Sequence, residues 1–376
     1  MARLFEPLDV GSLSLRNRIV IAPMCQYSAV DGCMSDWHLM HLGSLAMSGA
    51  GVLTIEATAV SAEGRITYAD VGLYDDACEH AMANVLAAVR RWSDMPIAIQ
   101  LAHAGRKASC EVPWDGGAQI APTAPNGWQT VAPSAIPFRG DDHAPVALDE
   151  DGLQKIRNDF AAAAQRSARL GLDAIQVHAA HGYLLHEFLS PISNQRDDEY
   201  GGCLENRMRF PLEIFDIVRA NFPAAKPVSV RISATDWVPE GWDVEQSVAF
   251  ARALEARGCS AIHVSSGGNA VDQQITVGPG YQVPFARAVR DAVSIPVVAV
   301  GLITEAAQAE QILADGDADL IGVARTILYD PHWPWHCAAE LGASVHAPNQ
   351  YLRSQPSGLR ELLQPMSTTL QAQKNP

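Results

Sequence analysis

Three side chains that can donate or move a proton stand close together in the sequence: His178, His181 and Tyr183. A neutral imidazole can donate a hydrogen bond to an oxygen on which negative charge develops, and a tyrosine, with an ordinary pKa of about 10, can act as a general acid at pH 7. Two histidines at this spacing could also bind a metal, but zinc needs a third ligand, and no carboxylate is obviously placed to supply it. We favour oxyanion binding by the histidines; metal binding and structural packing are the alternatives.

Eight nearly continuous apolar runs surround these residues and predict parallel strands that are buried on both faces. An amphipathic, helix-like segment follows each run, and eight such units are typical of a (β/α)8 TIM barrel of ~250 residues. We therefore predict an α/β fold of this class rather than a doubly wound sheet. The runs are residues 19–24, 52–59, 97–102, 174–180, 228–234, 261–266, 297–301 and 320–324, and the helical segments are 37–47, 76–92, 149–170, 205–221, 244–257, 284–293, 305–314 and 331–341.

The carboxyl ends of the strands carry the active site in this fold, and the residues there indicate a cofactor. Gly301 and the pair Ala324-Arg325 follow strands seven and eight, where barrels commonly bind a phosphate through backbone N–H groups. Gln100 and Arg231 reach the barrel mouth, and a buried arginine without a counter-charge implies an anionic ligand. A planar cofactor that carries a phosphate and becomes anionic when reduced fits both features, and FMN is such a cofactor.

The residues outside the eight barrel units fall into three segments. Residues 1–18 are expected to form a hairpin that caps the bottom of the barrel. Residues 103–148 form a loop after strand three that is far longer than the usual ~2–6 residues, and we interpret it as an active-site lid. We expect one domain over residues 1–341, followed by a polar C-terminal tail over residues 342–376 that contributes to a subunit interface.

Composition excludes several classes of protein. The net charge of −15 disfavours nucleic acid as a partner, and no apolar run is long enough to cross a membrane. Seven cysteines without a CxxC pair are typical of reduced thiols in a cytoplasmic protein. The sequence has no P-loop and no GxSxG nucleophile motif; the glycines at 278–280 do not complete a dinucleotide-binding fingerprint, and His186-Glu187 lacks the second histidine of a zinc-protease helix.

Several longer motifs resemble the Old Yellow Enzyme family, and more closely its thermophilic-like branch of bacterial ene reductases and xenobiotic reductases. These motifs are APMCQYS (22–28), EATAVSAEGRIT (56–67), QLAHAGRKA (100–108), HAAHGYLLHEFLSPISNQRDDEYGG (178–202), ENRMRFPLE (205–213) and VGLITEA (300–306). The resemblance covers residues 3–353. It implies an FMN-dependent ene reductase that takes hydride from NADPH and reduces the activated C=C bond of α,β-unsaturated carbonyl or nitro compounds. Hydride would pass from flavin N5 to the substrate, and Tyr183 would supply the proton.

The resemblance also implies roles for individual residues. His178 and His181 would clamp the substrate oxygen, Tyr27 and Tyr183 would flank the same pocket, and Cys25 would tune the flavin near N5. Tyr351 and Arg353 match residues that enter a neighbouring subunit's site, which implies a homodimer or homotetramer. The residues expected to contact non-covalent FMN are Ala22, Pro23, Met24, Cys25, Ala57, Gln100, Arg231, Ser266, Gly267, Gly301, Ala324 and Arg325.

Two features depart from the family pattern, and two other functions stay open. Ala324 stands where many relatives have glycine, and the 110–148 loop is longer than in compact members, which puts the substrate range in doubt. A metal-dependent barrel hydrolase that uses His178 and His181 would bind zinc and be colourless. A non-catalytic flavin-binding protein would be coloured without turnover.

Overall fold

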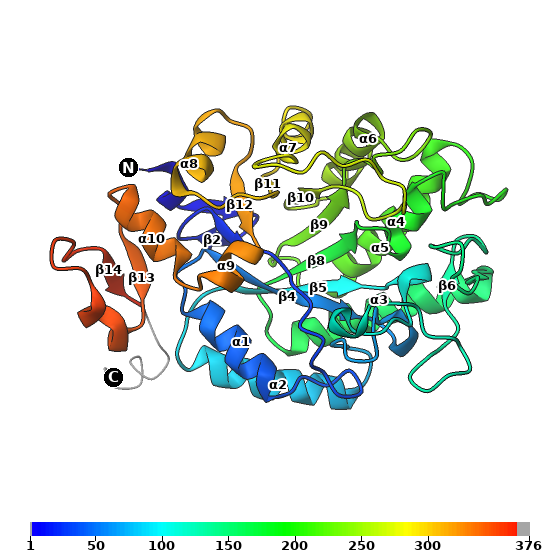
Figure 1. Cartoon of the computed structure of the whole chain (residues 1–376), viewed down its shortest axis with the longest axis horizontal. Helices are drawn as coiled ribbons and strands as arrows, with labels where there is room; N and C mark the ends of the chain where they lie inside the picture. The colour runs from blue at the N-terminus through cyan, green and yellow to red at the C-terminus, as the bar shows by residue number, and fades with distance from the viewer. Residues whose placement is uncertain (1, 367–376) are drawn as a thin grey trace.

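A computed structural model describes residues 2–366 and contains a closed barrel of eight parallel strands (Figure 1). Each strand pairs with the next along the chain, and the last pairs with the first to close the barrel. Each predicted apolar run contains one observed strand, so the predicted TIM barrel is confirmed. The strands are β3 (Ile19–Ile21), β4 (Val52–Ala59), β5 (Ile97–Ala102), β8 (Ala174–Ala179), β9 (Val228–Ser233), β10 (Ile262–Ser265), β11 (Val297–Ala299) and β12 (Leu320–Val323).

Eight helices surround the barrel at the predicted places. Three of them begin with an aspartate side chain that accepts a backbone N–H, as Asp149 does from Gly152 at 2.9 Å at the start of α3. Two short helices were missed, α4 (Leu184–Leu189) and α9 (Arg325–Tyr329), because every residue of α4 is buried and α9 spans little more than one turn. The eight are α1 (Asp36–Ala46), α2 (Asp76–Arg90), α3 (Glu150–Arg169), α5 (Leu204–Asn221), α6 (Val244–Ala256), α7 (Val283–Arg290), α8 (Ala306–Ala314) and α10 (Trp333–Glu340).

The predicted N-terminal hairpin caps the bottom of the barrel. After a short 3-10 turn, η1 (Arg3–Phe5), strands β1 (Leu8–Val10) and β2 (Leu13–Leu15) pair antiparallel. Their apolar side chains pack on a ring of small residues at the amino ends of the barrel strands, among them Val52, Ala98 and Ala174. With the bottom closed by apolar contacts, the opposite end of the barrel is left as the open mouth.

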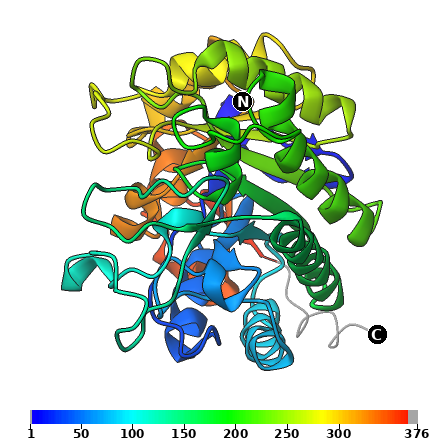
Figure 2. The ribbon, with the colours of Figure 1, turned by 90° about the vertical axis from the view of Figure 1, so that its right-hand side faces the viewer.

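The long loop after β5 has little regular structure of its own. It contains η3 (Gly105–Lys107), η4 (Pro113–Asp115) and the two-residue strands β6 (Val131–Ala132) and β7 (Val146–Ala147). In Figure 2, which turns the β6 side of the molecule toward the viewer, the teal part of this loop projects outward. Arg106 anchors the loop, because its guanidinium donates to Asn269 O at 2.8 Å and Asn269 Oδ1 at 3.0 Å.

The described part of the C-terminal tail is more ordered than its polar sequence predicts. Strands β13 (Val345–Ala347) and β14 (Leu363–Pro365) pair in parallel, with the 3-10 turn η5 (Asn349–Ser354) between them along the chain. Val345, Ala347, Leu363 and Met366 are buried. These strands lie on the side of the barrel opposite β6 (Figure 1). No helix among residues 2–366 is long and apolar enough to cross a membrane.

Candidate active site

The predicted site residues come from the carboxyl ends of neighbouring barrel strands. Strand register places His178 on β8 beside Arg231 on β9, and Gln100 on β5 beside Gln176 on β8. Ala57 on β4 lies beside Gln100, next to a β-bulge between Ile55 and Ala57. Parallel strands open at the same end of the barrel, so these side chains share one mouth.

His178, His181 and Tyr183 form one ring cluster. The His178 ring centroid lies 5.1 Å from that of His181 and 5.0 Å from that of Tyr183, both in edge-on geometry. His178 Nδ1 accepts the Ala180 backbone N–H at 3.2 Å, so the proton of its neutral ring is on Nε2. His181 Nε2 lies 2.8 Å from Ser265 Oγ. The predicted cluster therefore exists, with His178 presenting an N–H donor.

Burial sets the protonation states of this cluster. The pKa values of His178, which is buried, and of His181, which is half-buried, lie well below the ordinary value, first because the rings are shielded from water and second because Arg231 is close. Burial also raises the pKa of Tyr183 well above its ordinary value. At neutral pH the cluster thus consists of two uncharged imidazoles and a protonated phenol.

The turn that carries His181 is held by neighbouring loops. His181 has a left-handed backbone with φ +61°, and its N–H donates to Ser233 Oγ at 2.9 Å. Lys107 Nζ donates to His181 O at 2.8 Å and to Gly268 O at 2.7 Å. Burial followed by the nearby Arg106 lowers the pKa of Lys107 to about 8. These contacts fix the loops after β5, β8 and β10 relative to one another.

His186 and Asp236 support the same turn from below. His186 Nδ1 accepts the Gly182 N–H at 2.9 Å, and its Nε2 lies 3.2 Å from Asp236 Oδ1, with both side chains fully buried. The sequence motif around His186 is thus part of the site's support. Within residues 2–366, no three His, Cys, Asp or Glu side chains come together as a metal site.

The charge of Arg231 shows whether the site suits an anionic cofactor. Arg231 is half-buried; among residues 2–366 its guanidinium makes no ion pair or hydrogen bond, and its Nε atom is buried without a partner. Burial lowers the pKa of Arg231 to about 10, so the group still carries its charge at neutral pH. A cation that is partly removed from water and has an unpartnered Nε is costly, and an anionic ring system at the mouth would neutralise it. The residues present therefore fit FMN.

A cavity of about 200 Å³ next to Arg231 suits the phosphate end of such a cofactor. Gly301 adopts φ +118°, a conformation that favours glycine, and a Cβ at this position would lie 3.0 Å from Gln282 Nε2. Ser266 lies beside the cavity, where its Oγ donates to Gln282 Oε1 at 2.7 Å, and Gly267 follows it with φ +71°. The cavity is lined by Ala22, Arg231, Ser265, Tyr281, Gln282, Val300, Gly301, Leu302, Ile303, Gly322, Ala324, Arg325 and Thr326.

Tyr281 and Gln282 were missed by the sequence analysis. They directly follow the glycines at 278–280, a segment that was set aside because it lacks a dinucleotide-binding pattern. Gly280 N donates to Gly301 O at 2.8 Å, which brings this segment to the phosphate cavity. The glycines at 278–280 therefore indicate a tight turn beside the cavity.

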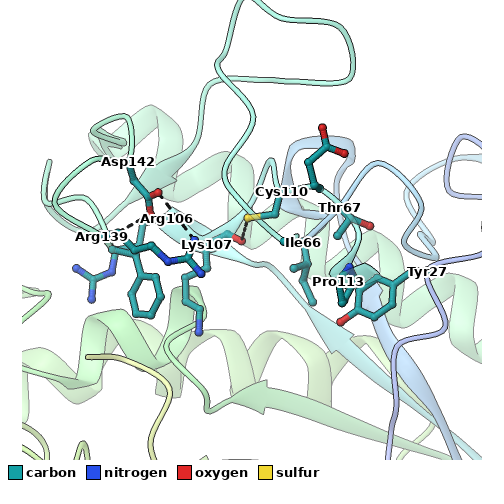
Figure 3. Close-up of a pocket in the computed structure, with 12 residues that line it drawn as sticks. Tyr27, Ile66, Thr67, Arg106, Lys107, Cys110, Pro113, Arg139 and Asp142 are labelled. Carbon is teal, nitrogen blue, oxygen red and sulfur yellow. Dashed lines mark hydrogen bonds and ion pairs between the residues drawn. The ribbon is translucent and has the colours of Figure 1, made fainter. Parts of the chain in front are cut away.

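A second cavity, of about 130 Å³, lies between Tyr27 and the long loop (Figure 3). Figure 3 shows Tyr27 on one side and Arg106 and Lys107 on the other, with Cys110 between them. Trp114, from η4 of the loop, packs edge-on against Tyr27 with ring centroids 5.9 Å apart. The loop thus lines a cavity beside Tyr27, a predicted substrate-binding residue, and its role as a lid stays a prediction.

Cys25, which follows Met24 in the segment after β3, is an uncharged thiol in this setting. Burial is the main reason that the pKa of Cys25 lies well above its ordinary value, and the carboxylates of Asp70 and Glu56 add to the effect. Glu56 fixes the segment, because its Oε2 accepts the Gln26 N–H at 2.8 Å. Pro23 and Met24 are half-buried in the same segment after β3.

Tyr351 and Arg353 lie apart from this site. Both are on η5, where the Tyr351 ring packs against Trp335 of α10 with centroids 6.0 Å apart. Neither residue lines the two cavities described above. Their predicted entry into a neighbouring subunit's site stays a prediction.

Comparisons with known proteins agree with this geometry. Residues 3–343 match the sequence profile of the NADH:flavin oxidoreductase / NADH oxidase family. An NADH:flavin oxidoreductase of Gibberella zeae is 43% identical over 365 residues (93% of this chain, 88% of the relative), and an NADPH dehydrogenase of Geobacillus thermodenitrificans is 42% identical over 352 residues (93% and 98%).

Solved structures of flavin oxidoreductases also resemble this chain. Morphinone reductase superposes with a TM-score of 0.75 at 31% identity, covering 91% of this chain and 90% of that chain. An Old Yellow Enzyme homologue from Zymomonas mobilis superposes with a TM-score of 0.74 at 26% identity, covering 92% and 94%. The barrel, the fit of Arg231 to FMN and these relatives lead to one conclusion: the chain belongs to the NADH:flavin oxidoreductase / NADH oxidase family and is an FMN-dependent oxidoreductase of the Old Yellow Enzyme type.

Proposed function

We propose that this oxidoreductase is an ene reductase that takes hydride from NADPH and reduces the activated C=C bond of α,β-unsaturated carbonyl or nitro compounds. The observation that carries the proposal is the cluster at the barrel mouth, in which an uncharged His178 with its N–H on Nε2 lies beside the protonated phenol of Tyr183. A site that only bound flavin would need no such donor and acid pair. NADPH as reductant follows the name of the bacterial relatives.

FMN, when bound, supplies the acceptance and donation of hydride. His178 binds the carbonyl or nitro oxygen of the alkene through Nε2–H and stabilises the negative charge that develops there. His181 provides a second donor when its Nε2 exchanges Ser265 Oγ for the substrate oxygen. Removing one such donor typically costs about 3 kcal/mol of transition-state stabilisation.

Tyr183 is the proton donor to the α-carbon. Its raised pKa keeps the proton on the phenol until carbanion character develops on the substrate. The ring is held between His178 and Lys107, whose Nζ lies 5.3 Å from the ring centroid. The positive charge of Lys107 near the ring favours loss of the phenolic proton during the reaction.

The other predicted residues hold and tune the cofactor. Arg231 and Gln100 would face the pyrimidine side of FMN, and the cavity at Gly301, Ala324 and Arg325 would hold its phosphate. Cys25, as an uncharged thiol, would lie near the reactive edge without adding a negative charge. Tyr27 and the loop around Trp114 would enclose the substrate.

We also propose that the chain works as a homodimer or homotetramer. Trp37 and Met40 on α1 and Tyr329 at the end of α9 are large apolar side chains that are 46%, 61% and 94% exposed. Trp37 and Met40 lie three residues apart on the same face of α1, and an exposed apolar helix face of this kind suits a subunit contact. Tyr351 and Arg353 would then enter the neighbouring subunit's site, and the protein is expected in the cytoplasm.

The visible absorption spectrum tests the proposed function. The purified protein should show flavin bands that bleach on anaerobic addition of NADPH and return on addition of cyclohexenone. Bands that bleach and do not return with any activated alkene would favour the non-catalytic or NADPH-oxidising alternative. A colourless protein that does not bind added FMN would overturn the proposal, and a zinc assay would then test the hydrolase alternative.

A further inference from the structure

A chain of three polar side chains lies inside the barrel, one layer below the mouth. Gln100 Nε2 donates to Gln176 Oε1 at 2.7 Å, and Gln176 Nε2 lies 3.3 Å from His263 Nδ1. The three residues come from β5, β8 and β10, and their exposed fractions are only 1%, 5% and 1%. Polar groups are placed this deep in a barrel only when their hydrogen bonds are satisfied or serve a ligand.

Among these three side chains, each hydrogen bond is donated toward His263. Because Gln176 Oε1 accepts from Gln100, the amide NH2 group of Gln176 faces His263 and donates to its Nδ1. His263 must therefore be neutral, and its pKa lies well below the ordinary value because it is buried and close to Arg231, its neighbour in the strand register, and to His178. With Nδ1 of His263 as an acceptor, the Gln176 oxygen faces Gln100, and the Gln100 amide nitrogen must point toward it.

The free end of the Gln100 amide is its carbonyl oxygen. No group among residues 2–366 donates a hydrogen bond to this oxygen, while the amide nitrogen is held by Gln176. If the donors and acceptors along these three side chains were reversed, Gln100 would present its NH2 group at the mouth instead. Its partner there would then have to be a hydrogen-bond acceptor and not a donor. Gln176 and His263 therefore decide which kind of group Gln100 can bind.

We propose that Gln176 and His263 are positioning residues that hold Gln100 with its amide oxygen ready to accept a hydrogen bond from the ring N–H of the FMN pyrimidine. The inference rests on the proposed placement of FMN at the barrel mouth. It assigns a role to two residues that would act through Gln100 and not on the cofactor itself. A cavity of about 60 Å³ below them, lined by Thr54, Ser229 and apolar side chains of the hairpin, separates them from the bottom of the barrel.

FMN titration of the apoprotein, followed by quenching of flavin fluorescence, tests the proposal without enzyme turnover. Gln176→Leu should weaken FMN binding about tenfold, because the Gln100 amide is then free to rotate and the flavin N–H loses its acceptor. Gln176→Glu keeps an oxygen that accepts from Gln100 Nε2 and should bind FMN within about threefold of the wild type. Ser229→Ala is the matched control, since Ser229 lines the same cavity and its hydroxyl bonds only to Ile175 O.

A double-mutant cycle separates positioning from general destabilisation. Gln100→Leu should weaken FMN binding about as much as Gln176→Leu, and the double variant should be no weaker than either single variant, because both remove the same hydrogen bond. Additive losses, or unchanged FMN binding by Gln176→Leu, would overturn the inference. If Gln176→Leu does not fold, the test rests on Gln176→Glu and Ser229→Ala. A loss of FMN affinity of about tenfold in Gln176→Glu, with wild-type affinity in Ser229→Ala, would also overturn the inference. Failure of the wild-type apoprotein to bind FMN would instead overturn the proposed function.

Discussion

Replacement of His178 by alanine removes the imidazole whose Nε2–H is presented at the barrel mouth, and it leaves the strand geometry of β8 intact. The structure gives this ring one internal hydrogen bond, from the Ala180 N–H at 3.2 Å, and leaves Nε2 available for substrate. Because the ring is neutral, its contribution is that of one preorganised donor to a developing oxyanion, about 3 kcal/mol. That value corresponds to a rate loss of about a hundredfold.

The assay separates the two half-reactions. The wild type and His178→Ala are reduced photochemically in the absence of oxygen and mixed with cyclohexenone in a stopped-flow instrument, and the return of flavin absorbance gives the rate of alkene reduction. This rate should fall about a hundredfold, and the affinity for a simple phenol should fall in parallel. Reduction of the oxidised enzyme by NADPH, measured in the same variant, should change much less and serves as the internal control.

Two outcomes would refute the reasoning. If His178→Ala reduces cyclohexenone within threefold of the wild-type rate, the histidine is not the oxyanion donor. If both half-reactions fall equally and the FMN content drops, the ring supports the cofactor site rather than the substrate. Ser265→Ala gives a complementary measurement, because it frees His181 Nε2 and should not reproduce the loss seen in His178→Ala.

Four further expectations follow from the same geometry. Tyr183→Phe should slow alkene reduction by about 10²-fold or more while NADPH oxidation is retained, and an unchanged rate in stopped-flow measurements would reassign the proton to water or Tyr27. Arg231→Met should weaken FMN binding at least tenfold, measured by apoprotein titration, because the unpaired cation then no longer attracts the cofactor; equal affinity would show that the cofactor lies elsewhere. Burial lowers the pKa of His178 and His181 and keeps both rings neutral below the ordinary histidine range, so the alkene-reduction rate should stay level from pH 7.5 down to pH 6; a change of rate in either direction around pH 6.5 would indicate normally titrating histidines. Incubation with a chelator should leave NADPH-dependent turnover unchanged, and a loss of turnover that zinc restores would show a metal requirement that the FMN-based proposal does not contain.

The architecture followed from short-range patterns. The continuous apolar runs that became β4, β5 and β8 are buried throughout, as strands covered on both sides must be, and the amphipathic segments between them became helices. Their alternation predicts the barrel, because parallel strands need a crossover helix and eight units close on themselves. The errors fall on α4 and α9, where burial on every side or shortness removes the helical period.

The surroundings of the site were harder to predict. Tyr281 and Gln282 at the phosphate cavity, and Lys107 between the loops of β8 and β10, act through contacts with residues far away in the sequence. No local pattern indicates such contacts, because they arise only when the barrel closes. The motif around His186 is an incomplete zinc motif in the sequence, and in the structure His186 supports the His181 turn.

The sequence by itself determined the barrel, and it predicted the end that carries chemistry and the side chains His178, His181, Tyr183 and Arg231 for that chemistry. These follow from residue types and from their order along strands, which are local properties. Tertiary structure decided the state of those groups: the tautomer of His178, the raised pKa of Tyr183 and the lack of a counter-charge for Arg231. Such states depend on burial and on neighbours brought in by other strands, because desolvation and hydrogen bonding are fixed only once the chain has closed around the site.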